Sequence, residues 1–193
     1  MTIEMLYEIL LSDKPSEYLK KYEDDLFLFI PELRKCKNFD QKSDWHIFDV
    51  YNHILNVVDN TDCNLPLRLA ALFHDAGKPY VYSVDELGKG HFYNHWMISK
   101  DIFDDFARNN NINYILSSLT SKLIEYHDLN LLETDKYDLD EFLYSFDNNE
   151  LDLLFNLKRS DLLAQNPKYR YYMDVIDNQE RFVKNLTRSK KVL

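Results

Sequence analysis

The stretch LFHDAGKPY, residues 72–80, places a histidine and an aspartate side by side at the end of an apolar segment. The segment PLRLAALF (66–73) is apolar on nearly every side, which predicts a buried, central helix. Its proline stands in the first turn, where a missing N–H costs nothing. Gly77 and Pro79 predict the end of this helix, with Gly77 as the C-terminal cap. We therefore expect the His–Asp pair at a relaxed helix end inside the core.

The composition predicts an all-α fold. The 193 residues are 45% hydrophobic and 15% aromatic, which indicates a folded core, and they include only 3 Gly and 5 Pro, too few for many short strands. Aromatic and β-branched residues alternate around Gly88 and Gly90, which predicts a short hairpin or loop near residues 80–94. The remaining patterns predict a bundle of seven or eight helices, at residues 3–11, 16–33, 47–59, 66–76, 94–108, 112–127, 140–164 and 168–187.

Charge and hydropathy narrow the function classes. The net charge of −10 disfavours a surface that tracks nucleic-acid phosphates, although the last segment is locally basic. No run of about 18 apolar residues predicts a membrane span, and the first residues do not resemble a secretory signal. Cys36 and Cys63 are isolated, as expected of free thiols in a reducing compartment. We therefore expect a cytoplasmic protein whose partner is a small molecule.

Five polar residues interrupt helix faces that should point inward. Each alone is readily explained as a buried side chain bonded to a backbone carbonyl, but burial without a partner costs several kcal/mol. Five such residues on five predicted helices indicate a shared cation, which would compensate all of them together. A mixed nitrogen and oxygen ligand set favours Mn, Fe, Co, Ni or Zn over Ca or a thiolate zinc site. The five residues are His53, His74, His95, His127 and Asp161.

Asp75 has a separate role in this hypothesis. Neighbouring residues on a helix point about 100° apart, so Asp75 cannot duplicate His74. A carboxylate has two oxygens and can bridge two cations, whereas an imidazole offers one free lone pair. A second pair, His127 and Asp128, is interpreted as incidental because Asp128 falls off the apolar face. The sequence therefore favours a two-cation centre bridged by Asp75.

The order and spacing of these residues resemble the HD superfamily of metal-dependent phosphohydrolases, from about residue 45 to 165. A narrower likeness is to the carboxy-terminal HD part of bacterial tRNA nucleotidyltransferases. The segments that carry it are IPEL (30–33), HIFDVYNHI (46–54), LRLAALFHDAGKP (67–79), GHFYNHWMIS (90–99) and LKRSDLLAQ (157–165). Those enzymes also carry a polymerase head with a Gly–Ser pair, which this chain, with glycines only at 77, 88 and 90, does not supply. We therefore do not expect nucleotide addition.

The resemblance implies an HD-domain helical bundle at residues 45–165. Residues 1–44 would form helices that pack on it, and residues 166–193 a C-terminal helix and tail, all in one compact unit. It also implies a phosphomonoesterase or phosphodiesterase that acts on a nucleotide or other small phosphate ester. Two divalent transition-metal ions would hold a bridging hydroxide, which would attack phosphorus.

The resemblance also implies a role for each residue. His53, His74, Asp75 and Asp161 would hold one ion, and Asp75, His95 and His127 the other. His74, Asp75 and Lys78 would form the catalytic group. Substrate would contact Lys78, Arg159 and His46, with Lys158 beside Arg159 as a further candidate, whereas His91 is expected outside the site.

Two other functions stay open at the level of sequence. A di-iron HD protein with oxygenase chemistry would present the same ligands, and a regulatory module would bind metal or nucleotide without turnover. Lys78 likewise has three interpretations, as a phosphate contact, as support for a metal ligand, or as an exposed lysine that follows a helix cap. Sequence spacing does not separate these alternatives.

Overall fold

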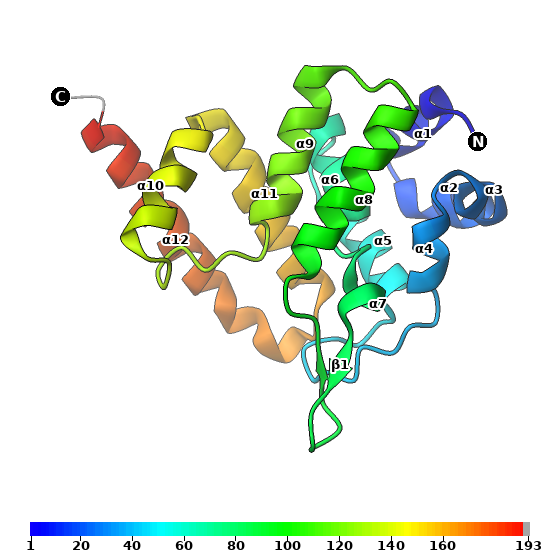
Figure 1. Ribbon diagram of the computed structural model, residues 1–193, viewed down its shortest axis with the longest axis horizontal. Helices are drawn as coiled ribbons and strands as arrows, with labels where there is room; N and C mark the ends of the chain where they lie inside the picture. Colours follow the sequence, from blue (N-terminus) through cyan, green and yellow to red (C-terminus); the bar gives the residue numbers. More distant parts are fainter. Residues whose placement is uncertain (191–193) are drawn as a thin grey trace.

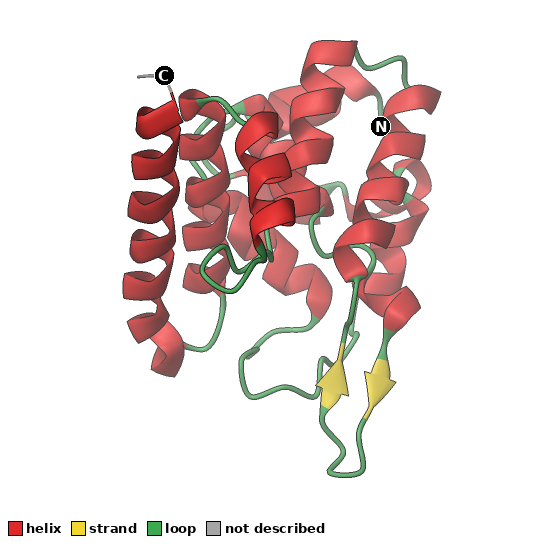
Figure 2. Ribbon diagram, turned by 60° about the vertical axis from the view of Figure 1, so that its left-hand side comes forward, coloured by secondary structure: helices red, strands yellow, loops and turns green. Residues whose placement is uncertain are grey.

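The computed structural model describes residues 1–190, so the last three residues of the predicted tail lie outside the described part. Helices form a bundle from which one small hairpin projects (Figures 1 and 2). This arrangement confirms the predicted all-α fold class. The helices are α1 (Ile3–Leu10), α2 (Pro15–Lys21), α3 (Glu23–Phe29), α4 (Pro31–Cys36), α5 (Val50–Asn60), α6 (Leu65–Phe73), α7 (Lys78–Val81), α8 (His95–Asn109), α9 (Tyr114–Tyr126), α10 (Lys136–Ser145), α11 (Asn148–Ala164) and α12 (Met173–Lys190), with a 3₁₀ turn η1 (Pro167–Tyr172) before α12.

The predicted central helix is α6. Every residue from Leu67 to Phe73 is buried, as expected of a helix with an apolar surface on all sides. It packs against α5, α9 and α11, and α8 contacts both α9 and α6. The N-terminal helices rest on this core, since α1 contacts α6 and both α2 and α4 contact α5.

Two of the predicted long helices are divided in the structure. The segment predicted as 16–33 is broken at Tyr22, which has φ −107° and ψ 30°, and again before Pro31. The Pro31 ring disfavours the helical conformation of Ile30, which has φ −130° and ψ 82°. The segment predicted as 140–164 is broken at Asp147, which caps α11. The Asp147 carboxylate accepts from the N–H groups of Asn149 and Glu150, and the Glu150 side chain accepts from the N–H of Asp147. The described chain therefore contains more helices than the seven or eight predicted.

The prediction that Gly77 is the C-terminal cap of the central helix is wrong. Helix α6 already ends at Phe73, a turn follows, and α7 begins at Lys78 with Pro79 inside its first turn. Gly77 has φ −79°, which any residue adopts. Its lack of a side chain provides room instead, because a β-carbon there would lie 2.4 Å from the His95 carbonyl oxygen.

The predicted hairpin is present as β1 (Ser83–Val84) and β2 (Gly90–His91), in which Ser83 pairs antiparallel with His91. It projects beyond the ends of the helices (Figure 2). The N–H of Gly90 donates to the Lys42 carbonyl over 2.9 Å, and a β-carbon at Gly90 would lie 2.2 Å from the Gln41 carbonyl oxygen. The hairpin is thus fastened to the loop that follows α4. None of the helices in the described range is long and apolar enough to cross a bilayer.

Candidate metal centre

Four imidazoles from four helices meet near one end of the bundle. His53 lies within α5, His74 caps the end of α6, His95 begins α8 and His127 caps the end of α9. All four are at most 6% exposed. Three of them stand at helix termini, where the backbone leaves its regular path and neighbouring side chains can turn toward a common point.

Backbone carbonyls orient three of these rings. Nδ1 of His74 lies 2.8 Å from the carbonyl oxygen of Ala71, and Nδ1 of His95 lies 2.9 Å from that of Phe92. His127 repeats the arrangement over 2.7 Å to the carbonyl of Ile124. A carbonyl only accepts, so each Nδ1 carries a hydrogen, and Nε2 of the neutral ring carries the lone pair. The lone pairs are thereby directed into the centre.

The Nε2 atoms face each other in two pairs. Nε2 of His74 lies 3.4 Å from Nε2 of His53, and Nε2 of His95 lies 3.3 Å from Nε2 of His127. Two lone pairs at this separation repel unless a proton or a metal ion lies between them and accepts both. Each pair is therefore built for a cation.

Asp75 lies between the two pairs. Its Oδ2 is 3.2 Å from Nε2 of His53 and 3.3 Å from Nε2 of His74. Its Oδ1 is 3.2 Å from Nε2 of His95. One oxygen of the carboxylate thus belongs to the first pair and the other to the second, which is the arrangement that a bridging ligand requires.

Asp161 and Lys78 complete the polar contacts around the first pair. Oδ1 of Asp161, from α11, lies 2.9 Å from Nε2 of His53 and 4.0 Å from Nε2 of His74. The Lys78 ammonium lies 2.7 Å from Oδ2 of Asp75 and donates to Oε1 of Gln41 over 3.0 Å. Lys78 is buried and lies over the Phe92 ring at 5.3 Å, so its interpretation as an exposed lysine is wrong.

The pKa values of these groups are shifted because the buried carboxylates need positive charge nearby. Burial lowers the pKa of His53, but hydrogen bonds to Asp161 and Asp75 outweigh this effect and raise the pKa to about 9. Burial raises the pKa of Asp75, but His74 and Lys78 reverse the effect and hold it well below its ordinary value. Burial and the neighbouring rings of His74 and His95 lower the pKa of His127. Without a metal, the proton on His53 balances the carboxylates.

The residues therefore fit metal ions. Two groups of ligand atoms, each with all its members within 4.8 Å of one another, could hold an ion. One group is His53, His74 and Asp75, and the other is Asp75, His95 and His127. Nitrogen and oxygen donors of this kind suit divalent transition metals. The two groups share only Asp75.

Comparison with known families agrees with this geometry. The family model described as the HD domain matches residues 46–184, which is more than two-thirds of the chain. The chain belongs to the HD-domain family. This is a superfamily of metal-dependent phosphohydrolases, and the match gives no evidence for the narrower relationship to tRNA nucleotidyltransferases. No curated protein matches the chain.

A cavity of about 470 Å³ opens beside the metal centre of the HD domain. Asp75, His95, His127 and Asp161 form part of its wall. His46 also lines it, with its ring packed edge-on against His53 at a centroid distance of 5.1 Å. Nδ1 of His46 is buried without a hydrogen-bond partner among the described residues. The cavity gives a substrate access to both cation positions.

The HD domain does not bring Arg159 or Lys158 into this cavity. The Arg159 guanidinium is held by α12, through a 2.7 Å ion pair with Asp177 and a second pair with Glu180. The Lys158 ammonium is buried and donates to the carbonyls of His127 and Leu129, each over 2.8 Å. Neither side chain lines the cavity. The expectation that Arg159 contacts a substrate is therefore unsupported, because its charge is already neutralised elsewhere.

Several residues of the cavity wall were not singled out from the sequence. His91 and Asp128 line it, although both were expected outside the site, and His91 is paired with Asp85 over 2.9 Å. Lys89 and Trp45 also line it. The only local signal for Lys89 was its place between two hairpin glycines. Trp45 and Asp128 reach the cavity through loop conformations that carry no periodic pattern.

Proposed function

We propose that this HD domain hydrolyses a phosphomonoester or phosphodiester bond in a nucleotide or other small phosphate ester. The observation that carries the proposal is the position of Asp75, whose two carboxylate oxygens face two separate pairs of imidazole nitrogens. Such a shared carboxylate suits a centre of two cations beside an open cavity. Membership of a superfamily of metal-dependent phosphohydrolases supports the reaction class.

The ligand assignment takes the two groups of donor atoms and adds Asp161 to the first, because its Oδ1 lies 2.9 Å from Nε2 of His53. His53, His74, Asp75 and Asp161 would hold one ion, and Asp75, His95 and His127 would hold the other, with Mn, Fe, Co, Ni or Zn as candidates. When bound, such ions would supply the positive charge that brings the pKa of water toward about 7 and offsets negative charge on a phosphate. The carbonyls of Ala71, Phe92 and Ile124 would keep the imidazoles in the tautomer that offers Nε2.

Lys78 and Lys89 would have different roles, one at the Asp75 carboxylate and the other at the substrate phosphate. Lys78 is buried against Asp75, so it would keep that carboxylate ionised and oriented, and its ammonium also borders the cavity. Lys89 is exposed on the hairpin and lines the cavity, without an ion pair or hydrogen bond from its ammonium among the described residues. It is the better placed of the two to meet a phosphate that enters from solvent. His46 would orient the substrate from the wall next to His53.

Aromatic groups at the cavity support a nucleotide as the substrate. Trp45 lines the cavity and stacks on Tyr169 with ring centroids 3.7 Å apart and planes at 11°. Tyr93 also lines the cavity, is largely exposed and stacks on His91. Flat, accessible rings beside a phosphate-directed centre are suited to a planar base.

Purified protein should be stripped with a chelator and reloaded separately with Mn, Co, Ni, Zn or Fe. Hydrolysis should then be measured on nucleoside monophosphates, 2′,3′-cyclic nucleotides, cyclic dinucleotides and chromogenic phosphates. We expect turnover with at least one metal, loss on chelation, and loss in Asp75→Asn. Bound metal without turnover on any ester would favour a regulatory module. Oxygen consumption by the iron-loaded protein would favour the oxygenase alternative, and either result would overturn the proposal.

A further inference from the structure

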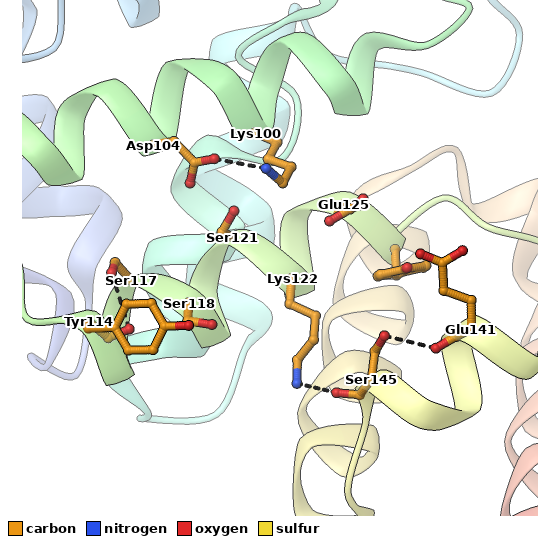
Figure 3. A pocket seen from close by; sticks show the side chains of 11 residues that line it. Lys100, Asp104, Tyr114, Ser117, Ser118, Ser121, Lys122, Glu125, Glu141 and Ser145 are labelled. Atoms are coloured by element: carbon orange, nitrogen blue, oxygen red, sulfur yellow. Dashed lines mark hydrogen bonds and ion pairs between the residues drawn. The ribbon is translucent and has the colours of Figure 1, made fainter.

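A second cavity, of about 430 Å³, lies between α8, α9 and α10 and shares no residue with the cavity at the metal centre (Figure 3). Its wall is dominated by hydroxyl and charged groups rather than by apolar side chains. Lys100 and Asp104 come from α8, Ser121 and Glu125 from α9, and Glu141 from α10. Ser121 stands six residues before His127 on the same helix, about 9 Å along its axis. The cavity is therefore separate from the metal centre.

The Ser121 side chain marks this cavity as a binding site. The residue is only 8% exposed, and its hydroxyl, which is accessible from the cavity, forms no hydrogen bond to any of the described residues. Figure 3 shows the hydroxyl directed into the cavity, toward α8. A serine inside a helix can bond to a carbonyl of the preceding turn, as Ser117 does to Tyr114 over 3.2 Å, and Ser121 does not. The Ser121 hydroxyl is thus free to donate to and accept from a ligand.

The charges of the cavity are only partly neutralised. The Lys100 ammonium is paired with Asp104 at 2.8 Å, and the Lys122 ammonium with Glu150 at 2.7 Å. Lys122 also donates to the Ser145 carbonyl over 2.6 Å. The carboxylates of Glu125 and Glu141 have no ion pair within 4.0 Å and no hydrogen bond among the described residues (Figure 3). Both cations of the wall are therefore occupied, while two carboxylates are available.

These features of the cavity indicate which chemical groups its ligand would carry. Free carboxylates recognise an amine, free hydroxyls recognise further hydroxyls, and the Tyr114 ring at the edge, which is 81% exposed, offers a flat surface for a saturated ring. We propose that the cavity between α8, α9 and α10 binds a hydroxyl-rich ring that carries an amine, of the amino-sugar class. Glu125 would accept from the ammonium, and Ser121 would exchange hydrogen bonds with a ring hydroxyl. The proposal does not depend on the hydrolase activity.

The full-length protein should be titrated with D-glucosamine, D-glucose and D-glucuronate, with binding followed by calorimetry and ligand-observed NMR. We expect saturable binding of glucosamine, weaker binding of the neutral sugar and none of the acid. Ser121→Ala and Glu125→Gln should each weaken glucosamine binding about tenfold, since each removes one polar partner. Ser160→Ala is the matched control, because Ser160 is also a buried helical serine but already bonds to Asn156.

A competition experiment with saturating inorganic phosphate tests whether glucosamine binds in this cavity or at the metal centre. Glucosamine bound between α8, α9 and α10 should remain when phosphate occupies the metals, whereas displacement would place it at the metal centre and overturn the proposal. It would also be overturned by the absence of saturable binding, by equal affinity for glucuronate, or by full affinity in folded Ser121→Ala and Glu125→Gln variants.

Discussion

The backbone N–H of Gly77 donates a hydrogen bond to the Ser99 hydroxyl over 2.9 Å. This bond joins the turn that carries Asp75 to α8, the helix that begins with His95. The two segments approach so closely that a β-carbon on Gly77 would lie 2.4 Å from the His95 carbonyl oxygen. The position of the bridging carboxylate relative to the second imidazole pair therefore depends on a residue without a side chain.

Gly77→Ala should destabilise the protein by about 3 kcal/mol, because the new methyl group meets backbone atoms that cannot move aside. It should also separate Asp75 from His95 and weaken cation binding by the second group. Urea unfolding and metal titration would measure the two effects. Gly88→Ala is the control, since that hairpin glycine has open space around it and φ +78°. It should cost about 1 kcal/mol and leave cation binding unchanged; unchanged binding in Gly77→Ala would contradict the proposed contact.

Asp75→Asn should weaken binding at both cation positions. The amide keeps the size of the carboxylate but loses its charge and one acceptor oxygen. We expect the affinity for Mn or Co to fall by more than the 10- to 100-fold typical of residues that only support a ligand. Metal analysis of the dialysed protein should show no retained ion. Retention of one full equivalent would mean that Asp75 does not bridge.

The two imidazole pairs should be separable by substitution. His127→Ala removes a donor from the second group only, and His53→Ala removes one from the first. Each variant should therefore retain about one of two equivalents of metal. Competition with a chromogenic chelator would count the ions. Loss of both ions in both variants would show that the partition into two groups is wrong.

The metal-free protein should lose stability as the pH rises above neutral. The pKa of His53 is raised to about 9 in the folded state, whereas the ordinary value is 6.5. The stabilisation from its protonated form is therefore complete below about pH 6.5 and disappears as the pH approaches 9. Urea unfolding in chelator at several pH values should show this decline, which His53→Gln should abolish. Metal-loaded protein should not show it, because the metal displaces the proton.

Arg159→Ala should lower stability by about 1 kcal/mol without changing metal content. Its guanidinium, partly exposed, joins α11 to α12 through Asp177 and Glu180. Thermal unfolding and metal analysis would test both expectations. Lys89→Ala is the complementary variant, which should raise KM for a phosphorylated substrate and leave stability unchanged. A large change in KM in Arg159→Ala would instead support the expectation from the sequence that Arg159 contacts the substrate.

Helical periodicity explains which parts of the centre could be predicted. His53, His74, His95, His127 and Asp161 each fall on an apolar helix face, so the inward direction of all five followed from the 3.6-residue repeat. The four histidines are buried, whereas the Asp161 side chain is 21% exposed. The same repeat predicted α6 as the core helix. It did not predict the breaks before Pro31 and at Asp147, because a local break replaces the regular repeat with proline geometry or side-chain capping.

The sequence by itself determined which side chains enter the core and that they demand a shared positive charge, because burial of unpaired imidazoles and carboxylates is costly. Only the tertiary structure decided that Asp75 stands between two nitrogen pairs and that Arg159 turns to α12 instead of the cavity. The physical reason is that a sequence pattern reports only on residues close together in the chain. Periodicity reports the face of one helix, whereas distances between helices, and the partners that long side chains reach, depend on how the whole bundle packs.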